Sequence, residues 1–340
     1  MRAALFDPEG GFRLGEVPEP EPDEGEIVVE VAGCGVCGSD RQIAAGATAP
    51  TGTVFPAVFG HEISGYVDGR SVAVFPIVPC GSCRLCSSGQ ESLCLAQQVI
   101  GYHRPGGYAE RVAVPEDRVI PLPQDIPLLA AGLLMDAVAT PFHALRSVVH
   151  LEAGESVAVV GGGGLGLGAL LGARAMGAGA TALVTRRKPD GVLRGLAERL
   201  GAQELWSTAE GTERSLVRQV RRWSGGGVDV VLDTAGSVRS VGLAMGLLRP
   251  GGRLCVVGME DEGGGPLPPI SHWVRRGIVV AGSYAATVED ARTLVGWAGS
   301  GRIEPALLEA MVAEVRPLAE IEEVFRQPGR TGRVVIRPEV

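Results

Sequence analysis

The 340-residue sequence has little lysine, few aromatic residues and few histidines. Lysine occurs once, at Lys188, aromatic residues make up 4% of the chain, and histidine occurs five times. Acidic residues outnumber basic ones by 39 to 31, which gives a formal net charge of −8. Nucleic acids and anionic membranes both attract basic surfaces, so this balance argues against either as the main partner.

Long uninterrupted hydrophobic runs are also missing. The 18 residues 156–173 carry no charge, which matches the length of a membrane-spanning helix, but seven of them are glycine. A strand, a tight turn and a helix explain this stretch better. Residues 1–20 contain no apolar signal-peptide core. We therefore expect a cytoplasmic protein with no membrane partner.

The placement of proline and glycine predicts two kinds of domain. Before residue 150, Gly/Pro turns separate short alternating segments at 27–33, 71–75 and 108–114, which predicts a β-rich domain. After it, helical segments near 192–200 and 238–248 alternate with apolar strands at 156–160, 180–184, 228–232, 253–257 and 278–280. Such alternation is typical of a doubly wound parallel sheet. Residues 289–340 predict a helix, a loop and the closing strand GRVVI.

The cysteine pattern indicates a metal site. The chain has seven cysteines, and this odd number argues against a complete disulfide framework. Four of them follow the spacing C-x2-C-x2-C-x7-C: Cys80, Cys83, Cys86 and Cys94. Four thiolates close the tetrahedral shell of a zinc ion and leave no open position, so the favoured interpretation is a structural zinc. An iron–sulfur cluster is the alternative.

A glycine motif predicts a dinucleotide site. Gly161, Gly163 and Gly166 form G-x-G-x-x-G directly after the apolar strand 156–160 and at the start of an apolar helix. The first glycine permits a tight turn, the second lets a pyrophosphate approach the backbone, and the third lets the helix pack on the strand. The motif alone is weak in a chain with 51 glycines, and its strand–turn–helix setting strengthens it.

The end of the second strand distinguishes between cofactors. An acidic residue about 20 positions past the glycine motif usually binds the ribose of NAD. Here the strand leads into Thr185, Arg186 and Arg187, and the first acidic residue is Asp190. Guanidinium groups bind phosphate in a bidentate manner, so we favour NADP(H) over NAD(H). The alternative is a solvated basic loop with Asp190 folded back onto a ribose.

A second group of residues of the kinds that bind metals lies near the N-terminus. Cys34 and Cys37 follow the strand 27–33, and His61 comes about twenty residues later. A thiolate and an imidazole are a plausible half-shell of a catalytic zinc, whose third protein ligand must come from elsewhere.

Together these motifs resemble the zinc-dependent medium-chain alcohol dehydrogenases/reductases. The similarity covers nearly the whole chain, in the order GVCGSD, GHE, the four-cysteine segment, GGYAERVAVP, the glycine motif, LRPGGRLCVVG and GRVVIRP. It implies an α/β protein with a GroES-like catalytic domain at 1–149, a Rossmann domain at 150–288, and a return to the catalytic domain at 289–340. It also implies a homodimer or a homotetramer.

The resemblance assigns roles to individual residues. The catalytic zinc ligands fall on Cys37 rather than Cys34, on His61, and on Asp136 in the family's third position at the start of a helix. Glu62 matches a glutamate that binds or approaches the metal. Asp40 matches an acid that orients the histidine ligand.

Further matches and departures concern the proton and the cofactor. Ser39 matches the hydroxyl that passes the proton at the substrate oxygen, and Thr140 matches a residue near the nicotinamide. Gln42 replaces a histidine of many relatives, which leaves two alternatives: a proton relay that runs through ribose and water, or a weakened relay. Pro141 replaces a common glycine, and the segment after His61 is about ten residues shorter than usual.

The reaction implied is hydride transfer between a nicotinamide cofactor and an alcohol, aldehyde or ketone, with one catalytic and one structural zinc per chain. A carboxylate as third ligand favours the sorbitol/threonine-type branch, and hence a small secondary alcohol or polyol. The alternatives are NADPH-dependent reduction of an activated C=C bond or an imine, and a non-enzymatic dinucleotide-binding protein. The set Cys37, His61 and Asp136 argues against the non-enzymatic alternative, because binding a dinucleotide needs no open metal site.

Overall fold

The computed structural model describes residues 1–259 and 267–338. It divides the chain into two compact units, one formed by Met1–Ala139 with Ala286–Val340 and the other by Thr140–Ala285. The sequence places the corresponding boundaries at 149/150 and 288/289. The first division lies earlier because most of helix α4 (Ala139–His143) and the π-helical turn Ala144–Val148 group with the second unit.

The first unit is built mainly on antiparallel strands, with one parallel pair, β17 and β18. Its strands are β1 (Arg2–Asp7), β2 (Gly11–Glu16), β3 (Glu26–Gly35), β4 (Ala57–Val58), β5 (Glu62–Val67), β6 (Arg70–Val74), β7 (Ile77–Val78), β8 (Gln98–Val99), β9 (Arg111–Pro115), β10 (Val119–Pro121), β17 (Val312–Pro317) and β18 (Arg333–Arg337). The largest sheet has the order β10-β6-β5-β3-β18-β17, with β9 also paired to β3, and a smaller sheet has the order β2-β1-β4. The β-rich N-terminal prediction is confirmed.

Short helices complete the first unit. They are α1 (Gly38–Ala44), α2 (Arg84–Ser87), α3 (Leu128–Ala131), α10 (Val288–Gly299), α11 (Pro305–Met311) and α12 (Ile321–Arg326). The prediction of one helix, a loop and a strand for the C-terminal tail is wrong, because α11, β17 and α12 also form there. The helices α11 and α12 have only seven and six residues, too few to show the helical period, and the sequence VAEVRP of β17 lacks a regular strand alternation. Phe12 packs on Phe325 of α12 with ring centroids 4.1 Å apart, which joins the tail to the N-terminal strands.

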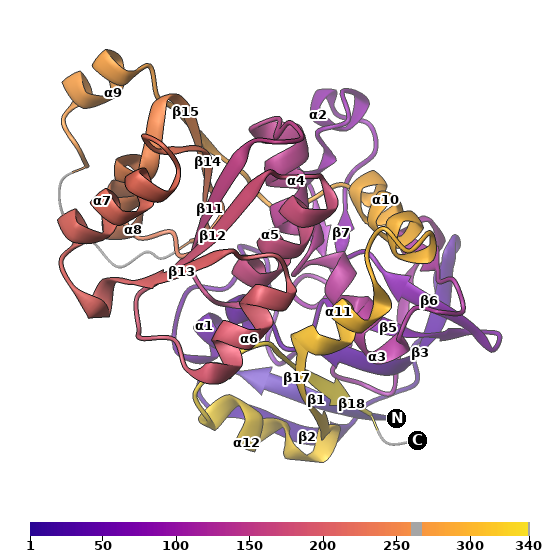
Figure 1. The fold of residues 1–340 in the computed structure, drawn as a ribbon. Helices are drawn as coiled ribbons and strands as arrows, with labels where there is room; N and C mark the ends of the chain where they lie inside the picture. Colours follow the sequence, from indigo (N-terminus) through magenta and orange to yellow (C-terminus); the bar gives the residue numbers. More distant parts are fainter. Residues whose placement is uncertain (260–266, 339–340) are drawn as a thin grey trace. The chain divides into compact units, whose positions relative to one another are not determined.

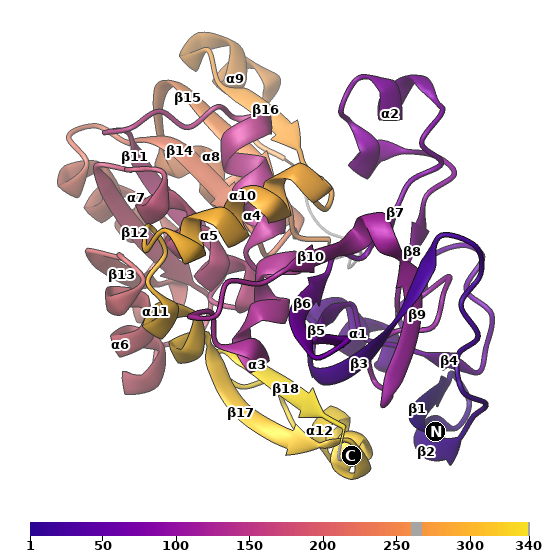
Figure 2. The ribbon, with the colours of Figure 1, turned by 90° about the vertical axis from the view of Figure 1, so that its right-hand side faces the viewer.

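A small lobe extends from the first unit. Its base is the β7–β8 pair, and Figure 2 shows α2 projecting beyond these two strands. The four clustered cysteines lie in the segment between β7 and β8, which also contains α2 and the 3-10 turn η1 (Glu91–Leu93).

The second unit is a six-stranded parallel sheet. Its strands are β11 (Ser156–Val160), β12 (Ala180–Thr185), β13 (Glu204–Ser207), β14 (Val228–Asp233), β15 (Leu248–Val256) and β16 (Val279–Gly282). The order is β13-β12-β11-β14-β15-β16, so the strand order reverses between β11 and β14 (Figure 1). This is the doubly wound arrangement that the alternating pattern predicts.

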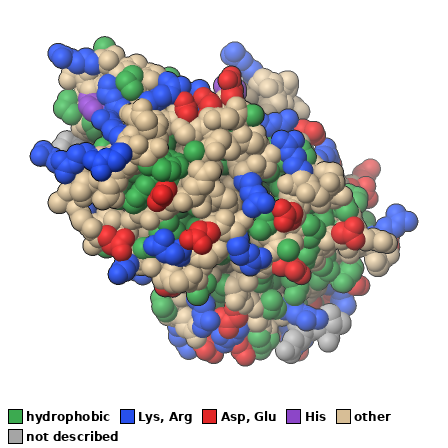
Figure 3. All heavy atoms as spheres, viewed as in Figure 1, with side chains coloured by type: hydrophobic (Ala, Val, Ile, Leu, Met, Phe, Trp, Pro, Cys, Tyr) green, Lys and Arg blue, Asp and Glu red, His purple; other side chains and the backbone are tan. Residues whose placement is uncertain are grey.

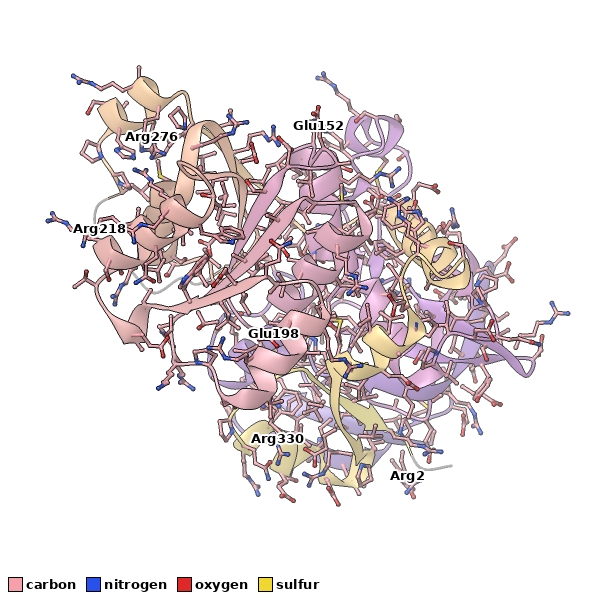
Figure 4. The ribbon with its side chains drawn as sticks, viewed as in Figure 1. Arg2, Glu152, Glu198, Arg218, Arg276 and Arg330 are labelled. Carbon is pink, nitrogen blue, oxygen red and sulfur yellow. The ribbon has the colours of Figure 1, made fainter. Side chains whose placement is uncertain are left out.

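Helices flank this parallel sheet. They are α5 (Gly164–Ala175), α6 (Gly191–Arg199), α7 (Glu213–Trp223), α8 (Val238–Leu247) and α9 (Ile270–Arg276). Strand β14 is almost wholly buried because helices cover parallel sheets on both faces. Arg276, labelled beside α9 in Figure 4, donates to the carbonyl oxygens of Met245 (3.1 Å) and Leu248. It thereby ties α9 to the connection between α8 and β15.

Charged side chains of both signs are interspersed over the face of the molecule in Figure 3. Among the described residues no single helix has both the length and the apolarity to span a membrane, although the bent pair Leu128–Met135 and Ala139–Val148 passes that test jointly.

Candidate functional site

Three of the predicted catalytic ligands converge in the first unit. Cys37 precedes α1, His61 precedes β5, and Asp136 follows the 3-10 turn η3 (Gly132–Met135). The Cys37 Sγ lies 3.1 Å and the His61 Nε2 lies 3.5 Å from Oδ2 of Asp136. The three ligand atoms all lie within 4.8 Å of one another. This set of sulfur, nitrogen and oxygen donors fits a zinc site with one position open.

Local backbone geometry places these ligands. Gly60 has φ +99, and a Cβ there would meet the Cys34 Sγ at 2.7 Å and the Tyr108 ring at 2.8 Å. Glycine is therefore required where the chain turns to present His61. The expectation that Asp136 begins a helix is wrong. It has φ −139 and ψ −64 in the break between η3 and α4, so the helix dipole does not account for an acid there.

Asp40 is fully buried behind His61. Its Oδ1 lies 3.5 Å from His61 Nδ1, close enough for a charge interaction but too far for a hydrogen bond, and its Oδ2 accepts from the Tyr108 hydroxyl at 2.7 Å. Burial alone would raise the pKa of Asp40, but His61 and the tyrosine hydroxyls hold this pKa below its usual value. Asp40 therefore has the place and the charge to orient the imidazole.

Glu62 contacts an arginine that the sequence analysis does not single out. Arg333, at the start of β18, donates from Nη2 to Oε1 of Glu62 at 2.7 Å and from Nε to both carboxylate oxygens at 3.1 and 3.2 Å. Both side chains are buried. The Arg333 Nη2 also lies 3.5 Å from the Cys37 Sγ. Glu62 is thus held beside the ligand cluster but is not one of its converging residues.

The pKa values of two of the three ligands, Cys37 and His61, reflect their crowding. Burial, followed by the nearby Asp136 carboxylate, raises the pKa of the Cys37 thiol. Burial would lower the pKa of His61, but the adjacent Tyr102 and Asp40 oxygens raise it well above its usual value. The raised pKa values mean that the thiol and the imidazole both tend to hold a proton. A divalent cation that binds at such a site displaces these protons.

The four clustered cysteines also converge. Within this cluster the Sγ–Sγ distances are 3.4 Å for Cys83–Cys86 and 3.9 Å for both Cys80–Cys86 and Cys83–Cys94. All four are free thiols. A tetrahedral ion with about 2.3 Å metal–sulfur bonds places its sulfurs about 3.8 Å apart, whereas a disulfide requires about 2.05 Å. The geometry therefore fits one four-coordinate metal.

Backbone amides prepare this lobe for a metal. Hydrogen bonds from the backbone at Ser82 and Cys83 lower the pKa of Cys80 to about 6. Burial, followed by a hydrogen bond with Cys83, raises the pKa of Cys86 to about 12. One thiolate is thus already favoured at neutral pH, and thiolates are the form that binds metals.

In the second unit, the glycine turn lies between β11 and α5. A Cβ on Gly166 would overlap the carbonyl oxygen of Gly161, and one on Gly161 would overlap the Thr234 hydroxyl. A Cβ on Gly163 would meet no protein atom within 4 Å. Internal packing therefore explains Gly161 and Gly166, whereas the space beside Gly163 is open at the N-terminus of a twelve-residue helix.

The predicted 2′-phosphate residues differ in availability. Arg186 and Arg187 are exposed after β12, and neither forms an ion pair within residues 1–259 and 267–338. Thr185 is buried and its hydroxyl donates to the Arg187 carbonyl oxygen at 2.8 Å, so it supports the loop from inside. Asp190 accepts from the Leu193 amide at 2.8 Å as the N-cap of α6.

Thr140 is the first residue of the second unit, in α4, and is 7% exposed. Ser39, on α1, lies 2.9 Å from the hydroxyl of Tyr102.

Sequence reasoning missed Tyr102, Tyr108 and Arg333. The available signal was weak: two tyrosines flank a glycine-rich turn, and one arginine precedes an apolar strand.

Comparison with known proteins identifies related sequences. Residues 23–124 match the family described as alcohol dehydrogenase GroES-like domain, and residues 164–300 match zinc-binding dehydrogenase. An alcohol dehydrogenase of Geobacillus stearothermophilus is 32% identical over 99% of both chains. The galactitol 1-phosphate 5-dehydrogenase of Escherichia coli K12 is 31% identical, covering 76% of this chain and 75% of the relative. A zinc-binding dehydrogenase of Sinorhizobium meliloti 1021 bound to NADP superposes with a TM-score of 0.87 at 27% identity over 99% of both chains.

Proposed function

The chain belongs to the zinc-dependent medium-chain dehydrogenase/reductase family, and from that premise we propose that it transfers a hydride between NADP(H) and a small secondary alcohol or polyol, or the matching ketone or aldehyde. The coarser assignment, a zinc-dependent alcohol dehydrogenase, follows from the family and its named relatives. The observation that carries the proposal is the convergence of Cys37, His61 and Asp136.

The catalytic metal would be held by these three side chains. A thiolate, a neutral imidazole and a carboxylate together carry two negative charges, which neutralise a zinc ion and leave its fourth position for substrate. A zinc bound in this way acts as a Lewis acid on the substrate oxygen, and the nicotinamide supplies the hydride chemistry. The four cysteines of the lobe would hold a second, structural zinc.

The surrounding residues have separate tasks. Asp40 orients His61 from behind, so that Nε2 is presented to the cluster. Arg333 donates to Glu62 at 2.7 Å and so offsets the charge of this buried carboxylate beside the ligands. Ser39 offers a hydroxyl on α1, two residues after Cys37, for the proton of the substrate hydroxyl.

The preference for NADP(H) depends on the charges after β12. An NAD ribose is usually bound by an acid at this position, but Asp190 is engaged in capping α6. Arg186 and Arg187 are exposed and unpaired by carboxylates in the described ranges, and they suit a 2′-phosphate. The similar Sinorhizobium meliloti protein was solved with NADP, which supports this choice.

The substrate class depends on the third ligand and on the relatives. Galactitol 1-phosphate 5-dehydrogenase and L-galactonate-5-dehydrogenase are both at least 30% identical to this chain, and both names describe oxidation of polyhydroxylated carbon chains. A small secondary alcohol or polyol is therefore the proposed substrate class.

Metal analysis tests the proposal. We expect two zinc ions per chain in the wild type and one in Asp136→Ala, whereas Asp125→Ala, which removes an exposed acid of the same unit, keeps two. A wild type with one zinc would contradict the open site and would favour reduction of an activated C=C bond or an imine. A screen of secondary alcohols and polyols follows, in which Arg186→Ala should raise the KM for NADP⁺ about tenfold but leave that for NAD⁺ unchanged.

A further inference from the structure

Ser39 has a hydrogen-bond partner that its predicted role does not explain. The Tyr102 hydroxyl lies 2.9 Å from Ser39 Oγ and 2.9 Å from Oδ1 of Asp40. The phenol ring is 8% exposed and packs between His61, with ring centroids 5.3 Å apart, and Phe59, at 5.4 Å. Tyr102 therefore joins the substrate-proton hydroxyl to the carboxylate behind the histidine ligand.

The direction of these hydrogen bonds follows from counting hydrogens. Asp40 accepts from the Cys37 amide, the Tyr108 hydroxyl and the Tyr102 hydroxyl, so it acts as an acceptor throughout. A phenol has one hydrogen, and Tyr102 uses it on Asp40. In the contact between Tyr102 and Ser39, the serine hydroxyl must then be the donor.

We propose that Tyr102 is a positioning residue that turns the Ser39 hydroxyl hydrogen towards its own phenol oxygen, so that a lone pair of Ser39 accepts the hydrogen bond of an alcohol substrate. A serine hydroxyl rotates freely when nothing fixes it, and in some of its orientations its hydrogen would face the hydrogen of an alcohol. This inference rests on the proposed function, because it needs a substrate hydroxyl. It also gives Ser39 a fixed partner in a chain where Gln42 replaces the expected histidine.

Tyr108 provides a matched control. Its hydroxyl donates to the same carboxylate, at Oδ2 and 2.7 Å, and its ring is fully buried. In the described part of the chain no hydrogen bond joins Tyr108 to Ser39; the Tyr108 hydroxyl also lies 3.3 Å from the Gly35 carbonyl oxygen, but its single hydrogen is donated to Asp40 at the shorter distance. Replacing either tyrosine with phenylalanine removes one oxygen and one hydrogen bond to Asp40, but only Tyr102→Phe frees the Ser39 hydroxyl.

A double-mutant cycle with Ser39→Ala tests the proposal in the zinc-loaded enzyme. We expect Tyr102→Phe to lower kcat for alcohol oxidation about tenfold, with KM, bound zinc and NADPH affinity close to wild type. In the Ser39→Ala background, Tyr102→Phe should lower kcat no further, because the effect of Tyr102 on kcat passes through Ser39. The fold-losses in kcat caused by Tyr108→Phe and by Ser39→Ala should instead multiply in the double variant.

Three results would overturn the proposal. The first is a wild-type kcat in Tyr102→Phe, and the second is a loss of kcat that multiplies with that of Ser39→Ala. The third is loss of zinc from Tyr102→Phe, which would mean that the phenol acts on His61 through Asp40. Zinc content and NADPH fluorescence titration report on each variant without turnover. A zinc-loaded wild type that binds NADPH and oxidises no alcohol would overturn the proposed function itself. Turnover with a multiplicative cycle would overturn the positioning role alone.

Discussion

The four-cysteine lobe should lose its fold when one of its thiolates is removed. Ordering the fifteen residues 80–94 costs about 15 kcal/mol at about 1 kcal/mol per residue. These residues bury little apolar surface, since Leu85 is half-buried and Leu93 is 46% exposed, so the two leucines contribute about 3 kcal/mol in all. A structural zinc would contribute about 10–16 kcal/mol, which would offset the remainder. On the proposed assignment, the metal would be the main source of order in this segment.

Cys86→Ser with limited trypsin digestion checks this reasoning. Arg84 is the only basic residue between Cys80 and Cys94, and it is exposed on α2, so trypsin reports on the opening of this segment. We expect Cys86→Ser to lose one zinc per chain and to be cleaved at Arg84 at least about 100-fold faster, equivalent to about 2.7 kcal/mol in opening free energy. The control, Leu95→Ser, should retain both zinc ions and resist cleavage as the wild type does.

Two outcomes would refute the argument. If Cys86→Ser loses a zinc but is cleaved at the wild-type rate, chain contacts hold the lobe, and the hydrogen bond from the Val288 amide to Glu91 at 2.7 Å would be the first candidate. If Cys86→Ser keeps both zinc ions, the four thiolates are not one metal site.

Three further predictions concern the rest of the molecule. Replacing Arg333 with methionine leaves the buried Glu62 without its cation, so urea denaturation of the zinc-free protein should show a loss of about 3–5 kcal/mol, which Glu62→Gln largely restores. Gly163→Ala should leave thermal stability unchanged but weaken NADPH binding about tenfold or more, whereas Gly166→Ala should destabilise the second unit by at least about 3 kcal/mol. In zinc-free protein at pH 7, iodoacetamide followed by mass spectrometry should find Cys80 alkylated before the other lobe cysteines, because its pKa of about 6 makes it the dominant thiolate.

Structural elements with a regular residue pattern could be predicted from the sequence alone. The parallel sheet is predicted from the apolar strands 156–160 and 228–232, which became β11 and β14, because buried parallel strands require near-continuous apolar residues. The cysteine spacing predicts the lobe, since its ligands come from one short segment. Helix α11 was not predictable, because seven residues span about two turns and show too little of the helical period. Strand β17 was missed because its sequence VAEVRP has neither a continuous apolar run nor a strict alternation of apolar and polar residues.

The candidate active site was only partly readable. Cys37, His61 and Asp136 were identified by resemblance, since 24 and 75 residues separate them and no spacing rule connects positions so far apart. Arg333 and Tyr102 were missed for a related reason. Each looks like an ordinary strand-start or turn residue until β18 pairs with β3 and the turn near residue 102 packs against α1.

The local features follow from the amino-acid sequence alone: the alternating strands and helices, the glycine turn, the four-thiolate segment and the absence of an acid at the end of β12. These depend on backbone preference and on ligands close together in the chain. Which buried charges meet depends on the folded chain. The contacts of Glu62 with Arg333, 271 residues apart, and of Ser39 with Tyr102, 63 residues apart, exist because strand pairing brings distant segments together. Burial then makes each polar group depend on the one partner within reach.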